Sequence, residues 1–165
     1  MSLVSPSGDG AVIVRAAAAE VVGGPGARVR LLVDGDATGG ALTSQQVTLA
    51  EGADGAAPHR HAHATELFYV LGGAVQVLAG ETVALAEVGD VIVVPPRLPH
   101  AFAAPPGRDA DLLIVLAPGI ERFDYFRLLD RLGRGEATID DLLASQDRFD
   151  NHFLDSPAWR AARAG

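Results

Sequence analysis

The chain is a series of short apolar runs separated by turn residues. Runs such as Arg28–Asp34 and Thr43–Ala50 alternate apolar and polar side chains, which is the period of a half-buried strand. Glycine and proline residues interrupt the pattern roughly every ten residues, as in an antiparallel sandwich or barrel. No helix-length pattern occurs between Glu51 and Pro118. We therefore predict an all-β fold with strands at Ala11–Arg15, Arg28–Asp34, Thr43–Ala50, Glu66–Leu71, Ala74–Ala79, Thr82–Ala86, Val91–Val94, Pro99–Ala103 and Asp111–Ala117.

The period changes after Gly119. Within Glu121–Leu132, apolar residues recur at threes, at Phe123, Phe126 and Leu129, so this segment is predicted to be an amphipathic helix. This apolar stripe is typical of a helix packed on a sheet, and it is also suited to closing one mouth of a barrel. Thr138 starts a second helix, with an aspartate three residues later in the pattern of a capping box.

The length of 165 residues favours a single domain. We expect a flexible N-terminus over residues 1–10, a β-barrel over 11–118, and a helical extension over 119–165 that packs on the barrel, because so short an extension cannot form a core of its own. The last residues, 160–165, are expected to be loose. Gly72 and Gly73 are predicted to form a hairpin turn that needs positive φ.

Charge and hydropathy exclude several classes of partner. The 21 acidic and 13 basic residues give a net charge of −8, which repels nucleic acids and anionic membranes. No apolar stretch is long enough for a transmembrane helix, and residues 1–10 lack the features of a secretory signal. We expect a cytoplasmic protein.

Two residue types are missing from the chain. The absence of cysteine excludes disulfides, thiol nucleophiles and zinc–thiolate sites. The absence of lysine excludes Schiff-base chemistry. An enzyme with this composition must rely on His, Asp, Glu, Ser, Thr, Tyr, Arg or a metal.

Histidines carry the strongest functional signal. His59 and His61 lie two residues apart, so on a strand they share one face, with their Cα atoms roughly 6.6 Å apart. Glu66 opens the next predicted strand and supplies a carboxylate, and His100 lies on a later one. If the sheet curls into a barrel, the four side chains can meet inside it. Three imidazoles and one carboxylate suit a divalent metal and leave one or two positions for water or substrate.

Other interpretations of these residues stay open. His59 and His61 are also compatible with a solvated turn or with hydrogen-bonded core histidines, and Glu66 with an exposed charge or with a carboxylate that misses the metal. His63 shares their strand parity, but it stands too close to Glu66 in the chain and is expected beside the site or on the surface. His152 is expected at the surface, near the end of a helix.

Two motifs resemble the cupin superfamily. His59-x-His61-x4-Glu66-x6-Gly73 is similar to its first motif, and Gly89-x5-Pro95-x4-His100 to its second. The resemblance covers about residues 40 to 118. It implies a double-stranded β-helix, a jelly-roll barrel, followed here by two C-terminal α-helices. It also implies a metal held by His59, His61, Glu66 and His100.

The second motif departs from the family pattern at two places. Arg97 replaces a glycine, so this arginine is a candidate for the pocket mouth, and Ala104 replaces a terminal asparagine, which makes the pocket more apolar.

Gln45, Val47 and Leu49 share one strand face, and Gln46 and Thr48 share the other, so either glutamine can point inward. The candidate pocket residues are Phe68, Val70, Phe102, Gln46 and Arg97.

The resemblance is closest to small quercetinase-like cupins. It implies a dioxygenase for a flavonol-like aromatic substrate, one divalent metal (Fe, Ni, Mn, Co, Cu or Zn), and Glu66 as a ligand that can also accept the substrate proton. Two other functions fit the sequence: a cupin that binds a small molecule without turnover, and a metal-assisted isomerase or decarboxylase that uses Arg97 or Arg60. The resemblance also implies a homodimer, paired through Ala11–Arg15 or Arg28–Asp34 as an edge strand.

Overall fold

The structure, a computed structural model, describes residues 10–165. Residues 1–9, most of the predicted flexible N-terminus, lie outside the described residues. The strands of the described part are β1 (Val21–Gly23), β2 (Ala27–Val33), β3 (Thr43–Leu49), β4 (His59–Arg60), β5 (Thr65–Ala79), β6 (Thr82–Glu87), β7 (Val91–Val94), β8 (His100–Ala103), β9 (Ala110–Ala117) and β10 (His152–Phe153). Its helices are η1 (Ala16–Ala18), η2 (Gly35–Thr38), α1 (Phe123–Gly133), α2 (Ile139–Ala144), α3 (Gln146–Phe149) and α4 (Pro157–Arg163).

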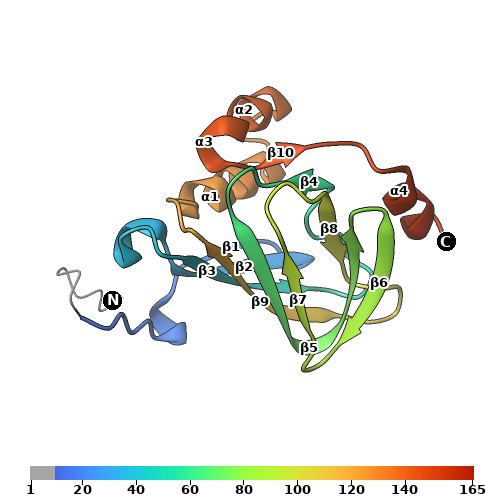
Figure 1. Ribbon diagram of the computed structural model, residues 1–165, viewed down its shortest axis with the longest axis horizontal. Helices are drawn as coiled ribbons and strands as arrows, with labels where there is room; N and C mark the ends of the chain where they lie inside the picture. The colour runs from blue at the N-terminus through green and yellow to red at the C-terminus, as the bar shows by residue number, and fades with distance from the viewer. Residues whose placement is uncertain (1–9) are drawn as a thin grey trace.

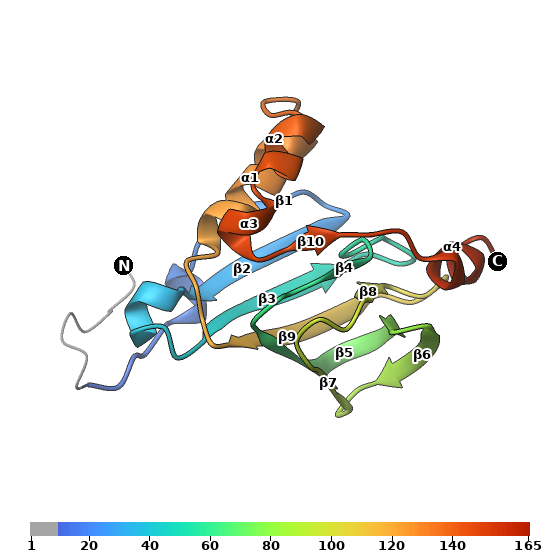
Figure 2. The same cartoon turned by 45° about the horizontal axis from the view of Figure 1, so that its top comes forward.

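The strands form one curled antiparallel sheet. Its order is β1-β2-β3-β9-β5-β8-β4-β10, and β6 and β7 also pair with β5. Figure 2 shows β2, β3, β9 and β5 side by side as one wall, and β8, β4 and β10 follow β5 in the strand order and form a second wall. Because β5 pairs with both β9 and β8, it joins the two walls. The predicted all-β barrel is confirmed.

The middle of β5 corrects one prediction. Gly72 and Gly73 do not make a hairpin turn, since the strand continues through them and shifts its register against β9 between Val70 and Gly72. Gly73 does have a positive φ, of 64°, and a Cβ there would lie 2.0 Å from the carbonyl oxygen of Asp109. Glycine therefore permits a bulge and a close backbone approach within one long strand.

The N-terminal prediction was also wrong. Residues 11–15 form no strand, and the first strand of the described chain is β1. β2 pairs with β1 on one side and β3 on the other, so it is not a free edge. Neither segment proposed to join two subunits offers an unpaired strand, and the homodimer stays a prediction.

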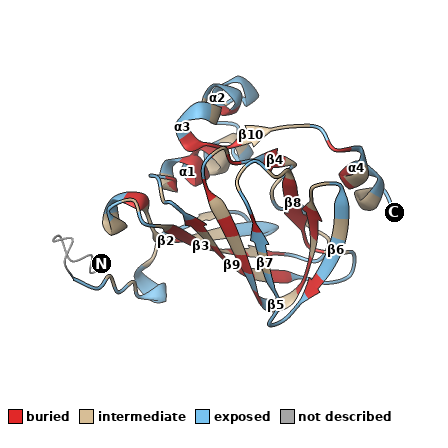
Figure 3. Cartoon of the chain, in the orientation of Figure 1, coloured by how far each residue is buried: buried red, intermediate tan, exposed pale blue. Residues whose placement is uncertain are grey.

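The main core fills the barrel interior. Phe68 and Val70 of β5 pack with Leu112 and Ile114 of β9, and all four are buried. In Figure 3 the buried colour is concentrated on β3, β9 and β8, whereas β7 and much of β6 are exposed. Alternating burial along β5 and β9 matches the alternation in the sequence.

The C-terminal extension forms four short helices where two were predicted. Its helix α1 packs Phe126 and Leu128 against Leu31 of β2, in a cluster separate from the barrel core. The capping box at Thr138 and Asp141 is present at the start of α2. Figures 1 and 2 show α1, α2 and α3 at one side of the barrel and α4 at the other, joined by β10.

The end of the chain is anchored, contrary to prediction. Arg163 donates hydrogen bonds to the carbonyl oxygens of Gly52 (2.9 Å) and Ala104 (3.0 Å) and to the side chain of Gln76 (2.9 Å). Two of these partners are backbone groups of the barrel, so α4 is tied to it. No helix within residues 10–165 is long and apolar enough to cross a membrane.

Candidate metal centre

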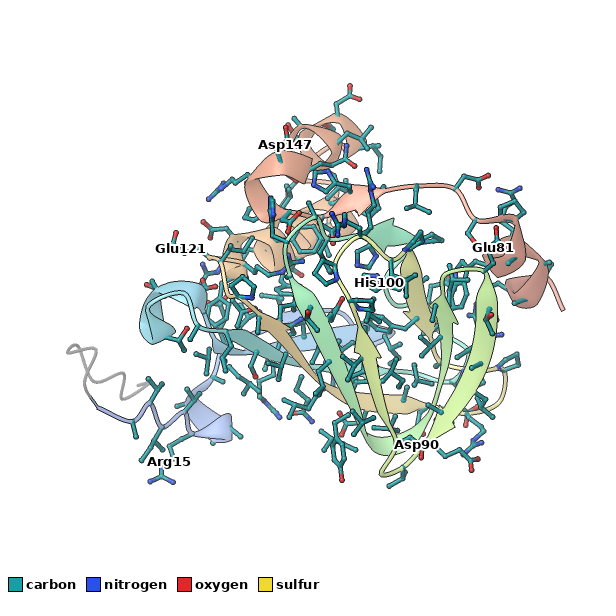
Figure 4. The ribbon with its side chains drawn as sticks, in the orientation of Figure 1. Arg15, Glu81, Asp90, His100, Glu121 and Asp147 are labelled. Carbon is teal, nitrogen blue, oxygen red and sulfur yellow. The ribbon has the colours of Figure 1, made fainter. Side chains whose placement is uncertain are left out.

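Three strands bring four predicted side chains to one point. His59 of β4 pairs directly with His100 of β8, and Glu66 lies at the start of β5. His61 follows β4 immediately, and its carbonyl oxygen accepts a hydrogen bond of 2.7 Å from the Arg97 amide. The labelled His100 lies inside the barrel in Figure 4. The curling of the sheet on which the sequence argument depended is therefore present.

The four groups form a compact buried cluster. One ligand atom from each of His59, His61, Glu66 and His100 lies within 4.8 Å of the other three, and all four residues are buried. Oε2 of Glu66 is 2.9 Å from Nε2 of His61 and 2.6 Å from Nε2 of His100. The ring centroids of His59 and His100 are 4.2 Å apart.

Backbone carbonyls fix the orientation of all three imidazoles. Nδ1 of His59 bonds to Ala57 O (2.7 Å), Nδ1 of His61 to Asp150 O (2.6 Å) and Nδ1 of His100 to Leu98 O (2.9 Å). A carbonyl oxygen only accepts, so each Nδ1 carries the proton and each Nε2 is turned to the centre as a potential ligand. Metal-binding histidines use the same hydrogen bond to set their tautomer.

The protonation states of His59 and Glu66 suit a cation. Burial holds the pKa of His59 well below its ordinary value, so this imidazole is neutral. Burial acts to raise the pKa of Glu66, but hydrogen bonds from His100 and His61 outweigh it and hold that pKa well below its usual range. Burial lowers the pKa of His100, and its hydrogen bond to Glu66 raises it overall.

The donor set fits a divalent transition metal. Three imidazole nitrogens and one carboxylate oxygen are borderline ligands, and they leave coordination positions open. With protons fixed on Nδ1, the short contacts from Oε2 of Glu66 to two Nε2 atoms need further protons or a cation between them. His59, His61, Glu66 and His100 would hold that cation.

A cavity of about 780 Å³ reaches this cluster. His59 and Glu66 contribute to its wall. Much of the remaining lining is apolar, and β2, β3, β9 and α1 contribute Val29, Val47, Leu49, Ile114, Phe126 and Leu129. Two residues of the predicted helix stripe, Phe126 and Leu129, therefore cover the cavity, and Phe123 does not line it. The volume lies within the range of small-molecule sites.

The structure distributes the five candidate pocket residues differently from the prediction. Phe102 lines the cavity, whereas Phe68 and Val70 are buried in the barrel core behind it. The prediction for Gln46 was wrong, since its side chain bonds to Arg30 (2.8 Å) and Asp111 (2.9 Å) outside the barrel. Its neighbour Gln45 lines the cavity instead, because strand alternation puts the two on opposite faces.

Arg97 also lies away from the cavity lining. It is exposed, with a positive φ of 71°, in the turn between β7 and β8. Arg60 is exposed on β4 and does not line the cavity either. Neither arginine is placed to hold a substrate carboxylate at the cluster, which was the requirement of the isomerase or decarboxylase hypothesis.

The two remaining histidines lie outside the cluster. His63 is exposed, as expected for one of its two interpretations. His152 was expected near a helix end at the surface, but it belongs to β10, which pairs with β4, and its side chain is 28% exposed. Nε2 of His152 is 3.3 Å from Oδ1 of Asp150.

Asp150 ties the C-terminal extension to the cluster. Its carbonyl oxygen holds His61, and its carboxylate accepts hydrogen bonds from the amides of Ala62 (2.7 Å) and His63 (3.0 Å). Burial acts to raise the pKa of Asp150, but these two bonds lower it overall. Sequence reasoning missed this residue, because an aspartate after a helix is also a common turn residue.

Sequence reasoning also missed Arg122, Tyr125 and Asn151, which line the cavity. All belong to the C-terminal extension. The helical period of Glu121–Leu132 was the only signal, and it draws attention to the apolar residues of α1 while leaving Arg122 and Tyr125 unremarkable. Burial raises the pKa of Tyr125 to about 12, so its phenol stays protonated.

Comparisons with known proteins agree with this architecture. Residues 45–116 match the family model described as Cupin domain. Together with the sheet topology, this match is consistent with the fold of a cupin β-barrel, and the barrel holds a candidate metal site. No curated protein matches the chain.

Solved structures extend the likeness. An RmlC-like cupin from Shewanella frigidimarina NCIMB 400 is 22% identical, with a TM-score of 0.55, over 66% of this chain and 90% of that one. Iron(II) HppE is 23% identical, with a TM-score of 0.57, over 66% of this chain and 61% of that one. The polyketide cyclase RemF from Streptomyces resistomycificus is 16% identical, with a TM-score of 0.57, over 91% of this chain and 96% of that one. At these identities the likeness is one of fold.

Proposed function

We propose that the protein is a metal-dependent enzyme that acts on an apolar, multi-ring aromatic substrate bearing oxygen substituents, and that its reaction is a dioxygenation. One observation carries the proposal: a largely apolar cavity of about 780 Å³ has His59 and Glu66 of the candidate metal cluster in its wall. A cavity of this size and lining takes a small organic molecule.

Each residue of the site has a distinct role in the proposed reaction. His59, His61 and His100 would hold the metal through Nε2, and Glu66 would hold it through a carboxylate oxygen. A bound divalent metal supplies a Lewis acid for a substrate oxygen and a place for dioxygen. Glu66 lines the cavity, so it is also the group within reach of the substrate hydroxyl proton. The apolar walls contributed by β3, β9 and α1 exclude water from the ring system.

Quercetin in air is the first test. Protein loaded in turn with iron, nickel, manganese or cobalt should consume dioxygen and bleach the visible absorbance of the flavonol. His61→Ala should abolish this activity, because it removes a buried ligand atom. His63→Ala is the matched control, since this exposed residue belongs to the same motif and lies outside the cluster. Absence of turnover with every metal would overturn the flavonol assignment.

A cyclisation without dioxygen is the second candidate. The likeness to RemF, a polyketide cyclase, extends over 91% of this chain, whereas the likenesses to the RmlC-like cupin and to HppE cover 66%. The wider coverage takes in part of the C-terminal extension, which lines the cavity. In that case Glu66 would remove a proton next to a carbonyl group, and the metal would polarise the oxygen.

A requirement for dioxygen distinguishes the two candidate functions. The dioxygenase requires it, and the cyclase converts a polyketide-like substrate equally well under nitrogen. A substrate panel tested in both atmospheres, with an oxygen electrode, distinguishes them. Tight binding with no turnover in either atmosphere would instead identify a binding protein.

A further inference from the structure

Arg122 is a buried cation in the cavity wall. It is only 4% exposed, and it takes part in none of the ion pairs within residues 10–165. Its Nη1 donates to the carbonyl oxygen of Phe149 at 2.6 Å, while its Nε is buried without a partner in the described chain. A buried guanidinium without an anion is costly, so such groups are normally paired.

The fold holds Arg122 in this position from two sides. The carboxylate of Asp34 accepts hydrogen bonds from the backbone amides of Arg122 (2.6 Å) and Phe123 (3.3 Å), so it is engaged at the start of α1. The Tyr125 ring covers the guanidinium, with its centroid 5.3 Å from Cζ. Burial lowers the pKa of Arg122, although the charge of Glu66 opposes this. The group is rigidly placed, and no neighbouring carboxylate neutralises it directly.

Asn151 supplies a second unused donor to the same cavity. It is 3% exposed, and its Nδ2 is buried without a hydrogen-bond partner among the described residues. Buried polar groups in folded proteins almost always have partners. Two orphaned donors in the wall of one cavity therefore indicate an acceptor that arrives with the ligand.

Another arginine, Arg134, also lines this cavity but is not equivalent. Its guanidinium is 3.1 Å from Asp130 and 3.4 Å from Glu136, and its side chain is 56% exposed. Exposed and paired, it contributes little to recognition of an anion. Arg122 is the buried cation available to a ligand.

We propose that Arg122 and Asn151 form a subsite for an anionic oxygen of the aromatic substrate, a phenolate, enolate or carboxylate, separate from the oxygen that faces the metal cluster. The inference rests on the proposed function for the substrate class and adds a charge requirement to it. Neutral aromatic molecules of the same shape leave both donors unpaired and bind more weakly.

A matched ligand pair tests this subsite without turnover. Zinc-loaded protein is titrated calorimetrically with 2-naphthoate and with the neutral naphthalene-2-carboxamide. Wild-type protein should bind the anion about tenfold or more tightly than the amide, as expected for a charge-assisted hydrogen bond. Arg122→Met should remove that preference while leaving amide binding nearly unchanged. Because zinc is present in both proteins, any attraction of the anion to the metal cancels in the comparison.

Two further variants complete the design. Arg131→Met removes an exposed arginine of the same helix that does not line the cavity, and it should retain the full preference. Asn151→Leu keeps the branched shape of the side chain and its number of heavy atoms, removes the donor, and should reduce the preference severalfold. If Arg122→Met does not fold, as judged by circular dichroism, an unchanged preference in Asn151→Leu overturns the subsite.

The outcomes also separate this inference from the proposed function. Equal binding of anion and amide by wild-type protein, or a full preference in Arg122→Met, would overturn the subsite and leave the metal enzyme standing. A preference that depends on Arg122, found in a protein with no turnover on any substrate, would support the subsite and overturn the proposed catalysis.

Discussion

The two walls of the cavity contrast in how their polar groups are satisfied. At the barrel end, each imidazole of the cluster uses Nδ1 on a backbone carbonyl, and Oε2 of Glu66 lies 2.9 and 2.6 Å from Nε2 of His61 and His100. On the C-terminal side, Arg122 and Asn151 present buried donors that have no partner in the described chain. The first wall is preorganised for a cation and the second for an anion. A molecule with two separated oxygens is the ligand that satisfies both.

The two walls are also coupled at one residue. Asp150 belongs to the C-terminal segment, yet its carbonyl oxygen orients His61. Its carboxylate accepts hydrogen bonds from the backbone amides of Ala62 and His63. The extension is thus more than a cover for the barrel. Substitutions at Asp150 should therefore affect the metal site, and substitutions elsewhere in the extension should not.

His100→Ala should have the largest effect, because it removes a metal ligand and a partner of buried Glu66. Leaving one member of a buried ion pair unpaired costs about 3–5 kcal/mol. We expect metal content to fall from one ion per chain to almost none, and the protein to unfold at lower urea concentration. Elemental analysis and urea titration measure the two effects. His152→Ala, which lies outside the cluster, should retain its metal.

Phe126→Ala tests the wall of the cavity that is formed by α1. Phe126 is 8% exposed and packs in the cluster between α1 and β2, so its truncation should cost about 3 kcal/mol. Metal content should stay normal, because no ligand moves. A loss of metal equal to that of His100→Ala would contradict the separation of the two walls.

Asp150→Asn tests the route between the walls. The substitution preserves the left-handed backbone at this position, where φ is 48°, but it replaces the carboxylate that holds Ala62 and His63. Metal affinity should fall by about 10- to 100-fold, the usual cost of disturbing the groups that orient a ligand. Competition with a chromogenic chelator measures it, and an unchanged affinity would remove Asp150 from the metal site.

Thr138→Ala should have the smallest effect. It tests whether the C-terminal extension acts on the metal site only through Asp150. It removes the capping box of α2, and Thr138 is exposed and belongs neither to the metal cluster nor to the cavity lining. Stability should fall by about 1 kcal/mol, and both metal content and ligand preference should be unaffected. Thermal unfolding with a parallel metal assay provides the check.

Much of the barrel could be predicted because its signals are local. Alternation at the end of Thr43–Leu49 follows from the burial of one strand face, and Val91–Val94 is a strand-forming run of β-branched residues although Val91 and Val93 are exposed. His59, His61, Glu66 and His100 were recognised together from their spacing in two motifs. The bend of β5 was mistaken for a turn, because a glycine with positive φ serves either structure and only the partner strand distinguishes them.

What the sequence determined by itself was most of the strands from β2 to β9, the candidate metal ligands, and the limits that an acidic chain without cysteine or lysine sets on its chemistry. Only the tertiary structure decided which glutamine enters the cavity and that Arg122, Asn151 and Asp150 belong to the site. His61 and Asp150 are separated by 89 positions in the chain. Strand alternation and helix period act over a few residues, whereas the place of these groups depends on how the extension folds back over the barrel.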